Sequence, residues 1–485
     1  METDYDVVII GAGISGINVA YRLQSQFPSL RYVILDNREN LGGTWDLFKY
    51  PGIRSDSDLF TFGFDWYPWY QNNPIASGPD IIKYLEDAAT KHGIKDNMRF
   101  QHKVLSADWS STEKTWSLTI TKNGQPTPTS LSTQFLIFGT GYYSFETPLQ
   151  TQIPGLTNFS GQVIHPQFWP QDLDYTDKKI VIIGSGATAI TLLPTLAQKA
   201  AKVTMLQRSP SYIISVRNRT GSWLTSLLPT SLQHRLARLR SLHLGRLFYL
   251  FSQSFPNAAK RLLTRGVARQ LPAHIPLSPH FTPSYNPWAQ RLCAAPDGDF
   301  FKSLHTGRAD VQTDTIRQVT ASGIELDSGS KLDADLIVTA TGLKVEFGGR
   351  VALSLDGVPY QLNGKYTWRG MMFQDLPNAA FLFGYANASW TLGADATSVF
   401  ICRLWRVLEQ RHALGVVPRL SEEEAGQLVP ERFMKLNSTY INRALADLPL
   451  ASDREIWSPA SDYFAGMKFA KKGSLEGLEF LDVKD

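Results

Sequence analysis

Residues 5–16 read YDVVIIGAGISG, and this stretch decides the fold. The β-branched run at 5–10 predicts a strand, and a helical pattern of apolar residues follows at 17–23. Gly11 permits a tight turn, Gly13 lets the backbone approach a pyrophosphate, and Gly16 lets the helix lie close to the strand. Free N–H groups at the helix N-terminus favour a phosphate there. The stretch therefore predicts a dinucleotide site rather than a glycine turn without a ligand.

An acidic residue stands at the distance that such a site requires. Residues 32–35 predict a second strand, and Asp36 ends it, 20 positions after Gly16. A carboxylate at that place can hydrogen-bond the hydroxyl groups of a ribose.

The same unit occurs a second time. A predicted strand at 180–183 leads into Gly184-Ser185-Gly186-Ala187-Thr188-Ala189 and a helical pattern at 190–196, with Ala189 in place of the third glycine. The next strand, 203–206, is followed by Gln207-Arg208 instead of an acid. Arg208 can pair with a 2′-phosphate that a carboxylate would repel. We therefore predict NADPH at the second turn and FAD at the first; the alternative for Arg208 is a solvated surface arginine.

Two further strands divide the chain. Residues 135–138 and 335–339 each read as a buried strand that ends in a turn of a small residue, Thr and Gly. We predict an α/β fold with two nested Rossmann-like domains of the FAD/NAD(P)-binding type and a helical insertion. The expected segments are an FAD-binding domain at 1–143 and 343–485, an NADPH-binding domain at 144–215 and 288–342, and a helical subdomain at 216–287.

Composition excludes several classes of protein. The 485 residues are 43% hydrophobic and 19% charged, which is typical of a folded globular protein. No run approaches the roughly 18 apolar residues of a membrane-spanning helix, and the acidic start does not resemble a signal peptide. The only two cysteines, Cys293 and Cys402, supply no disulfide framework, CxxC pair or zinc site. We expect a cytoplasmic protein with no metal.

Charge is distributed unevenly along the chain. Residues 178–296 contain no Asp or Glu but sixteen Lys and Arg, although the whole chain carries a formal charge of only +4. Such a block attracts anions. The block shows no alternation of aromatic and basic residues of the kind that reads nucleic acid, so no nucleic-acid partner is expected.

The helical region inside this block is amphipathic. Leu232, Leu236, Leu239 and His243 fall on one face at helical spacing, with arginines near them. Two interpretations stay open: the leucines pack on a neighbouring element, which we favour, or the helix makes a peripheral contact with an anionic membrane.

Two longer motifs carry a resemblance to a known family. The first runs from Gly42-Gly43-Thr44-Trp45 to Tyr50-Pro51-Gly52-Ile53-Arg54-Ser55-Asp56, and the second is FSGQVIHPQFWP at 159–170. They resemble the two fingerprints of Baeyer–Villiger monooxygenases, which are class B flavoprotein monooxygenases, and most of all the ethionamide-activating type. The resemblance covers most of the chain and is weakest in the helical region and near the C-terminus. The matching positions of the second motif are Phe159, Gly161, His165 and Trp169.

The resemblance implies an activity and its cofactors. It implies FAD, NADPH and, as co-substrate, O2, with Gly43, Thr44 and Trp45 among the FAD contacts. In this family the reduced flavin forms a C4a-peroxyflavin that converts ketones to esters or lactones and can oxidise sulfides to sulfoxides. We therefore expect a small ketone or thioether as substrate.

The resemblance also assigns roles to single residues. It makes Arg291 the catalytic cation, because an arginine keeps its charge in a site that stabilises an oxyanion, and Asp56 the partner that holds it. From the residues alone, the alternatives are a surface arginine and a turn-capping carboxylate. The resemblance makes His165 a residue that couples the domains rather than a proton donor.

One position departs from the family pattern. Many relatives have a lysine where this chain has Gln290, which leaves Arg208 and Thr188 to hold the 2′-phosphate.

The substrate pocket is the part of the site that the sequence determines least. Candidate pocket walls are Phe60, Tyr385, Asn387 and Trp390, and ordinary packing is the alternative for each.

Three other functions stay open at this point. The chain could be a flavin-dependent electron transferase or quinone reductase that inserts no oxygen, or an oxygenase of nitrogen and sulfur with little Baeyer–Villiger activity. A non-catalytic nucleotide-binding scaffold, tethered to a membrane or nucleic acid through the acid-free block, is the third.

Overall fold

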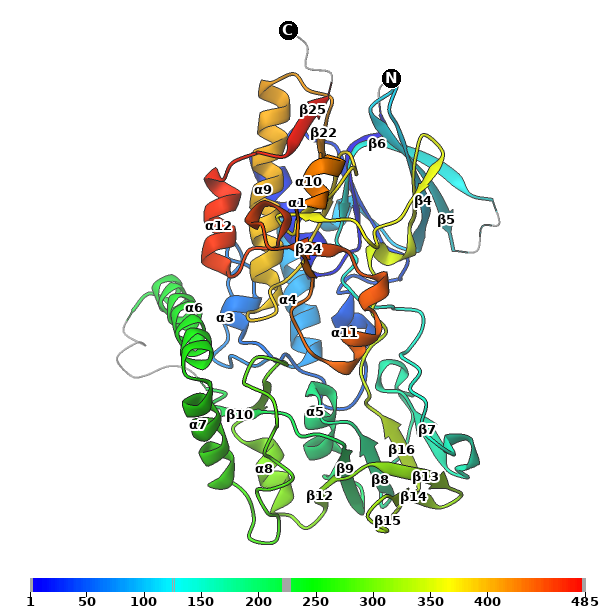
Figure 1. Cartoon of the computed structure of the whole chain (residues 1–485), viewed down its shortest axis with the longest axis vertical. Coiled ribbons are helices and arrows are strands. Elements are labelled where there is room, and N and C mark those ends of the chain that lie inside the picture. The colour runs from blue at the N-terminus through cyan, green and yellow to red at the C-terminus, as the bar shows by residue number, and fades with distance from the viewer. Residues whose placement is uncertain (1–2, 124, 126, 220–227, 482–485) are drawn as a thin grey trace.

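The computed structural model describes residues 3–123, 125, 127–219 and 228–481. These residues form two lobes, one above the other in Figure 1, and each lobe is built on a sheet. The sheet of the upper lobe takes strands from residues 5–138 and 352–381, and that of the lower lobe from residues 162–339. The α/β fold class predicted from the glycine motifs is confirmed, whereas the five segment boundaries stay a prediction.

The upper sheet is built around β1 (Tyr5–Ile10). β1 pairs in parallel with β2 (Tyr32–Leu35) and with β6 (Thr129–Phe138). Adding β3 (Met98–Arg99) and β21 (Ala379–Phe381) gives five parallel strands in the order β3-β2-β1-β6-β21. The first half of β6 continues into a ladder with four more strands: β5 (Thr115–Lys122), β4 (His102–Ser110), β17 (Ala352–Leu355) and β18 (Val358–Tyr360).

Both faces of β1 are buried. Val7 and Ile9 join the core beneath α1 (Ile14–Gln26) and α9 (Trp390–Gln410), while Val8 and Ile10 join the core beneath the β4–β6 ladder. This explains why the strand is a continuous apolar run and not an alternating one.

The lower sheet repeats the order of four strands of the upper one, and its fifth strand comes from a segment that precedes β8 in the chain. Its five parallel strands run β12-β9-β8-β16-β7, so β8, which carries the second glycine turn, holds the place that β1 holds above. Their bounds are β7 (Gln162–Ile164), β8 (Lys179–Ile183), β9 (Lys202–Gln207), β12 (Ala309–Thr313) and β16 (Leu336–Thr339). α5 (Ala187–Leu196) follows the turn, as α1 does above.

The remaining elements complete the two lobes. The other helices are α2 (Thr44–Leu47), α3 (Leu59–Phe62), α4 (Gly78–Lys91), α8 (Asp299–Leu304), α10 (Glu422–Gly426), α11 (Thr439–Arg443) and α12 (Tyr463–Lys472). The short strands are β10 (Ile213–Val216), β11 (Cys293–Pro296), β13 (Ile316–Thr320), β14 (Gly323–Leu326), β15 (Lys331–Asp333), β19 (Thr367–Trp368), β20 (Met372–Phe373), β22 (Gly415–Pro418), β23 (Pro430–Arg432), β24 (Leu450–Ser452) and β25 (Leu478–Leu481).

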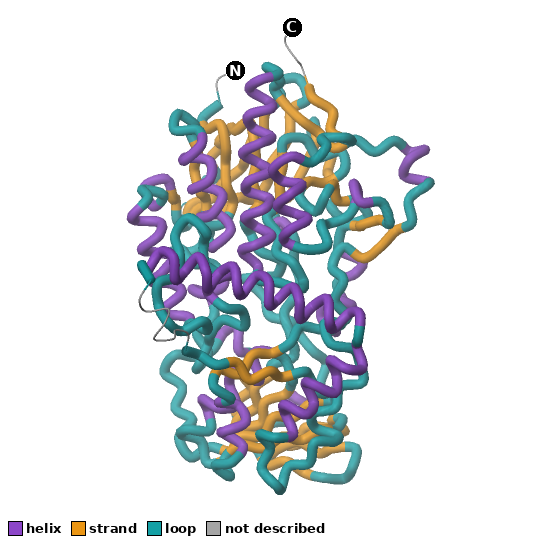
Figure 2. The backbone as a smooth tube through the Cα atoms, turned by 90° about the vertical axis from the view of Figure 1, so that its left-hand side faces the viewer, coloured by secondary structure: helices purple, strands orange, loops and turns teal. Residues whose placement is uncertain are grey.

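The predicted helical region contains two helices, α6 (Thr230–Ser254) and α7 (Pro256–Ala268). Figure 2 shows α6 lying across one face of the molecule between the lobes. The favoured interpretation, that this face packs on a neighbour, is wrong for Leu232, Leu236 and Leu239, which are 42%, 46% and 52% exposed. It holds for His243, whose ring stacks on Phe464 of α12 with ring centroids 5.3 Å apart. Among the described residues, no helix is long and apolar enough to cross a membrane.

Candidate active site

The first glycine turn is as tight as its sequence predicts. Gly11 has φ of +108°, which a residue with a side chain rarely adopts, and a Cβ added there would lie 2.6 Å from the carbonyl oxygen of Gly139. A Cβ on Gly16 would lie 2.0 Å from the carbonyl oxygen of Gly11. The absence of side chains therefore lets α1 begin directly against the end of β1.

Asp36 is fixed beside this turn by backbone N–H groups. Its Oδ2 accepts a 2.7 Å hydrogen bond from Ala12 and its Oδ1 a 2.8 Å bond from Arg38. Burial raises the pKa of Asp36, and these two backbone donors partly oppose that shift. Gly13 lies close to Gly43 of the first fingerprint, since a Cβ on Gly13 would be 3.7 Å from the Cα of Gly43.

The second glycine turn has the same form but is more open. A Cβ on Gly184 (φ +136°) would lie 2.2 Å from the carbonyl oxygen of Ala340, whereas one on Gly186 would meet nothing within 4 Å. Ser185 donates a 2.9 Å hydrogen bond to the carbonyl oxygen of Ser209. Ala189 is buried in the lower core, so it packs the helix and does not face the cavity.

At the end of β9, Gln207 and Arg208 have different surroundings. Gln207 is buried and donates to the His280 carbonyl oxygen and to Thr313 Oγ1. Arg208 is exposed, lines the cavity described below and has no polar partner among the described residues. Gln290 lines the same cavity.

The first fingerprint connects the two lobes. Thr44 accepts a hydrogen bond from the hydroxyl of Tyr143, and Trp45 packs edge-on against Phe62 with ring centroids 5.6 Å apart. Arg54 forms an ion pair with Asp299 of α8 in the lower lobe. The sequence reasoning missed this pair, because nothing in the spacing of residues 54 and 299 reveals that they meet.

The second fingerprint lies at the edge of the lower sheet. A Cβ on Gly161 would lie 2.5 Å from the Asp335 carbonyl oxygen and 2.7 Å from the ring of Phe159. Phe159 and Trp169 are buried in two different cores of the lower lobe. Among these four residues only His165 lines the cavity.

His165 is held on one side of its ring. Nδ1 accepts a 3.3 Å hydrogen bond from the N–H of Gln167, and Nε2 has no well-formed partner among the described residues. Burial lowers the pKa of His165, and the Gly342 carbonyl partly offsets this effect. A neutral imidazole therefore faces the cavity.

The structure brings Arg291 and Asp56 together. Arg291 Nη1 lies 3.4 Å from Asp56 Oδ2, and Nη2 donates a 3.2 Å hydrogen bond to the carbonyl oxygen of Tyr385. Burial acts to lower the pKa of Arg291, but Asp56 and then Tyr142 and Tyr440 outweigh it and raise the pKa. The guanidinium therefore stays charged.

Two tyrosines that the sequence reasoning missed complete this cluster. Tyr142 stacks on Trp390 with ring centroids 5.3 Å apart, and both line the cavity together with Tyr440 of α11. Burial, and next the charge of Tyr142, raise the pKa of Tyr440 well above its usual value. Ala289 accepts a backbone bond from Asn437, which attaches the segment before α11 to the Arg291 loop. The weak resemblance near the C-terminus left no signal for Tyr440.

Three of the four expected pocket walls do not line this cavity, so their place in a substrate pocket stays a prediction. The ring of Phe60 packs against His234 of α6, and Asn387 donates to the Ser461 carbonyl oxygen. Tyr385 directs its hydroxyl toward Gly466 of α12, where a Cβ would be 2.0 Å away, and supplies only its carbonyl to Arg291. Trp390 does line the cavity, and its Nε1 donates a 2.9 Å bond to Ser15 Oγ.

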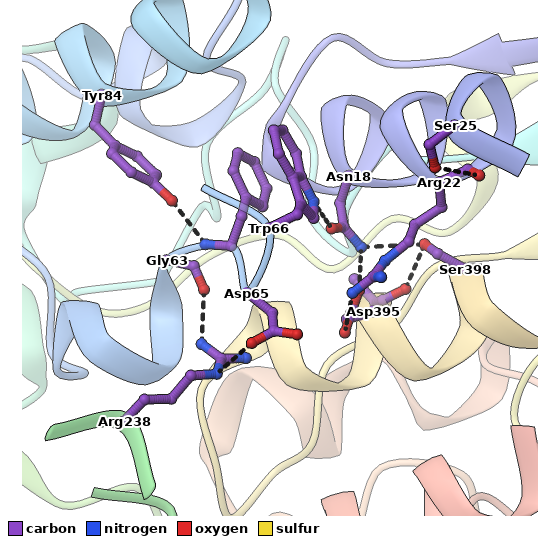
Figure 3. Close-up of polar contacts among 12 residues, drawn as sticks. Asn18, Arg22, Ser25, Gly63, Asp65, Trp66, Tyr84, Arg238, Asp395 and Ser398 are labelled. Carbon is purple, nitrogen blue, oxygen red and sulfur yellow. Dashed lines mark hydrogen bonds and ion pairs between the residues drawn. The ribbon is translucent and has the colours of Figure 1, made fainter. Parts of the chain in front are cut away.

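A polar network fixes the helix behind the first turn. Arg22 of α1 pairs with Asp395 of α9 at 2.9 Å, and Asn18 donates to Asp395 and Ser398 while it accepts from Trp66 Nε1 (Figure 3). α1 and α9 thereby hold Ser15 and Trp390 in place at the cavity.

One cavity of about 850 Å³ joins all of these parts. Its walls include both glycine turns, the first fingerprint and the Arg291 cluster. Among the predicted site residues they comprise Gly11, Gly13, Asp36, Gly43, Thr44, Trp45, Asp56, His165, Gly184, Ser185, Gly186, Thr188, Arg208, Arg291 and Trp390. Gly16 and Ala189 act one layer behind, by close packing.

The residues that line the cavity suit two dinucleotides. Each turn leads into a helix whose N-cap is a glycine and has no side-chain cap, so backbone N–H groups stay available to a pyrophosphate. Asp36 stands beside the first turn, and the unpartnered Arg208 stands beside the second. Thiol and metal chemistry have no comparable support in the described residues. Burial raises the pKa of both Cys293 and Cys402 to about 12, and no cluster of metal-ligating side chains is present there.

Comparison with known proteins agrees with this geometry. Residues 8–241 match the family model of pyridine nucleotide-disulphide oxidoreductases. The chain is 44% identical to the FAD-containing monooxygenase EthA of Mycolicibacterium smegmatis and 43% identical to EthA of Mycobacterium tuberculosis, in both cases over 99% of this chain and 98% of the relative.

Solved structures share the fold. The complex of OTEMO with FAD and NADP has a TM-score of 0.76 at 19% identity, over 99% of this chain and 100% of that one. Cyclohexanone monooxygenase from Rhodococcus sp. Phi1, bound to NADP+, has a TM-score of 0.74 at 20% identity with the same coverage. By its full-length identity to the EthA proteins, the chain belongs to the FAD-containing monooxygenases of the Baeyer–Villiger type.

Proposed function

We propose that this monooxygenase uses NADPH and O2 to convert ketones to esters or lactones, and that it also oxidises thioethers to sulfoxides. One observation carries the proposal. Arg291, held by Asp56 and by the carbonyl of Tyr385, lies in the wall of the single cavity that takes in both glycine turns. A permanent cation is thus present where two dinucleotides would bring their reactive rings together.

Each cofactor has its own set of residues. FAD is assigned to the first turn with Asp36, Gly43, Thr44 and Trp45. NADPH is assigned to the second, with Gly184, Ser185, Gly186, Thr188 and Arg208. When bound, the flavin supplies the activation of O2 with electrons taken from the nicotinamide. We assign Phe159, Gly161, His165 and Trp169 to the coupling between the lobes, because His165 reaches the cavity and Trp169 shares a core with Tyr50 of the first fingerprint.

The chain's own contribution is electrostatic. Arg291 is placed to stabilise negative charge that develops on oxygen during the reaction, and a preorganised donor of this kind contributes most in a site that excludes water. Asp56 and the Tyr385 carbonyl fix two of its nitrogens, so little reorganisation is needed when charge appears.

The selectivity for NADPH rests on Arg208. Its guanidinium is exposed to the cavity and has no ion pair among the described residues, so it is available to a 2′-phosphate. Gln290 lines the same cavity but is uncharged, so it adds no positive charge that would attract the 2′-phosphate.

The substrate is expected to be uncharged. Tyr142, Trp390 and Tyr440 line the same cavity as Arg291, with Trp390 stacked on Tyr142, and an aromatic enclosure favours apolar organic groups over ions. A ketone or thioether meets this requirement, although the walls do not select one of them.

The decisive experiment uses the purified holoenzyme with NADPH under ¹⁸O2 and a panel of linear, cyclic and aryl ketones and bulky thioethers. We expect mass spectrometry to show one labelled oxygen in ester, lactone or sulfoxide. Labelled sulfoxide without any ester would identify an oxygenase of heteroatoms and refute the ketone part. NADPH oxidation that reduces quinones, with no label in any product, would identify an electron transferase and refute the proposal.

A further inference from the structure

The outer face of α6 carries an apolar surface in two parts, separated by His243, whose ring stacks on Phe464 of α12 at 5.3 Å. Five residues make up what we call the leucine stripe, and each is 42–61% exposed: Leu232, Leu236, Leu239, Leu247 and Leu250. At 100° per residue they fall within about 80° of the helix circumference. Phe255, at the junction with α7, is 60% exposed, and Leu262 of α7 is 57% exposed. Exposed apolar surface of this kind marks a binding face more often than a solvated one.

The other face of α6 is already satisfied by the protein. Arg238 donates to the carbonyl oxygens of Phe60 at 2.7 Å and Gly63 at 3.0 Å, as Figure 3 shows for Gly63. Phe248 and Tyr249 pack edge-on against Trp288 at 6.3 Å and 5.6 Å. The helix is thus fixed in its orientation, and the leucine stripe faces outward because the inner contacts are complete.

Positive charge surrounds the stripe. Around the helix, Arg235 falls beside one edge of the stripe and Arg240 beside the other, and both are exposed. Arg261, Arg265 and Arg269 are exposed on or just after α7. None of these five arginines forms an ion pair with a described carboxylate, whereas Arg246 of the same helix pairs with Asp462 at 3.3 Å. The block 178–296 itself contains no acid.

We propose that this face, the leucine stripe with the arginines beside it, docks on the surface of an anionic lipid bilayer. A helix that has leucines on one side and arginines along their edges lies in the membrane interface, where the leucines enter the acyl boundary and the arginines meet phosphate groups. The proposal concerns binding alone and does not depend on the proposed oxygenation.

Charge decides against a second copy of the chain as the occupant. A two-fold dimer would place the same patch on both sides of the interface. The arginines beside each stripe would then face arginines, with no acid of the block between them. A phosphate-rich bilayer removes this repulsion.

The test is flotation of the holoenzyme with vesicles of phosphatidylcholine, with or without phosphatidylglycerol. We expect binding only with phosphatidylglycerol, and weaker binding as salt is added. Arg235→Gln with Arg240→Gln should lower the partition coefficient about 25-fold, at roughly fivefold per charge. Leu236→Gln with Leu247→Gln should abolish binding. Unchanged flavin content and circular dichroism show that each variant is folded.

Matched controls lie outside the patch. Lys83→Gln with Lys95→Gln removes two exposed charges, and Val358→Gln with Val429→Gln removes two exposed apolar groups. Both control variants should float like the parent. The proposal is overturned if neutral vesicles bind equally, or if the leucine variant still floats. It is also overturned if that variant changes only the molar mass in light scattering, which would show that a second copy covers the stripe.

Discussion

The Nη1 atom of Arg291 lies 3.4 Å from Oδ2 of Asp56, although the two residues are 235 positions apart in the sequence. Asp56 belongs to the fingerprint that leaves the upper lobe, and Arg291 precedes β11 in the lower half of the molecule. The contact is longer than an ideal charge-assisted hydrogen bond. The Tyr385 carbonyl supplies the second restraint. The orientation of the guanidinium is therefore fixed by two segments of the upper lobe, one that carries Asp56 and one that carries Tyr385.

Arg291→Ala should separate cofactor use from oxygen insertion. The variant keeps both glycine turns, so FAD content and anaerobic reduction by NADPH should persist. Ester formation should fall by about 10²–10³-fold, as when an oxyanion donor is removed. Arg317→Ala, an exposed arginine of β13 outside the cavity, is the control. Labelled ester at the parental rate would exclude Arg291 from the reaction.

Asp56→Asn should act through Arg291. It removes the charge that helps to orient the guanidinium but leaves the Tyr385 carbonyl, so we expect a loss of roughly tenfold in kcat, smaller than that of Arg291→Ala. Once Arg291 is absent, Asp56→Asn should cost little more, because residues that share one interaction are not additive. Losses in the double variant that simply multiply would show that Asp56 acts independently.

Arg208→Ala should change the choice of nicotinamide cofactor. Loss of a charge-assisted contact is worth about 1.5–3 kcal/mol, which is a rise in KM for NADPH of roughly 10- to 150-fold. NADH lacks the 2′-phosphate and serves as the internal control, since its KM should stay nearly constant. Equal increases for both cofactors would mean that Arg208 does not contact the phosphate.

The sequence could predict what depends on local geometry. The strands around residues 5–10 and 180–183, the turns after them and the positions of Asp36 and Arg208 follow from apolar runs and glycine spacing. The two sheets confirm the nested α/β fold. The roles of Arg291 and Asp56 were predicted only from the resemblance to the family, because no spacing in the sequence indicates that the two residues meet.

Long-range packing is what the sequence did not predict. The leucines of α6 have a helical period that is equally consistent with a buried face and an exposed one, and the contacts of Arg238 and Trp288 decide which side faces the protein. Tyr440 lies 149 positions after Arg291 on a short helix, and the loop carrying Tyr385 rotates that ring toward α12. Periodicity does not encode either placement.

His165→Gln should reduce the acid sensitivity of folding. Burial holds the pKa of His165 below 6.5 in the folded protein, so the unfolded chain binds its proton first as the pH falls. Above pH 6.5, His165 is neutral in both the folded and the unfolded chain, and it does not weaken folding. As the pH falls toward the folded-state pKa, the unfolded chain binds the proton more strongly, so the free energy of unfolding decreases. Urea titrations should therefore show the parent losing stability relative to the variant below about pH 6.5. A pH-independent difference would contradict this.

Asp395→Ala should destabilise the upper lobe strongly. Its carboxylate is almost fully buried and serves both Arg22 and Asn18, so its removal leaves a partly buried cation and an amide without their acceptor. Breaking such a pair costs roughly 3–5 kcal/mol in the free energy of unfolding. Lys331→Ala, which breaks the exposed pair with Glu325, should cost less than about 1 kcal/mol and is the matched control. Arg22→Met with Asp395→Leu should recover much of the loss, because no charge is then left unpaired. Urea unfolding of the four proteins measures these differences, and similar losses for Asp395→Ala and Lys331→Ala would show that the network in Figure 3 contributes little to stability.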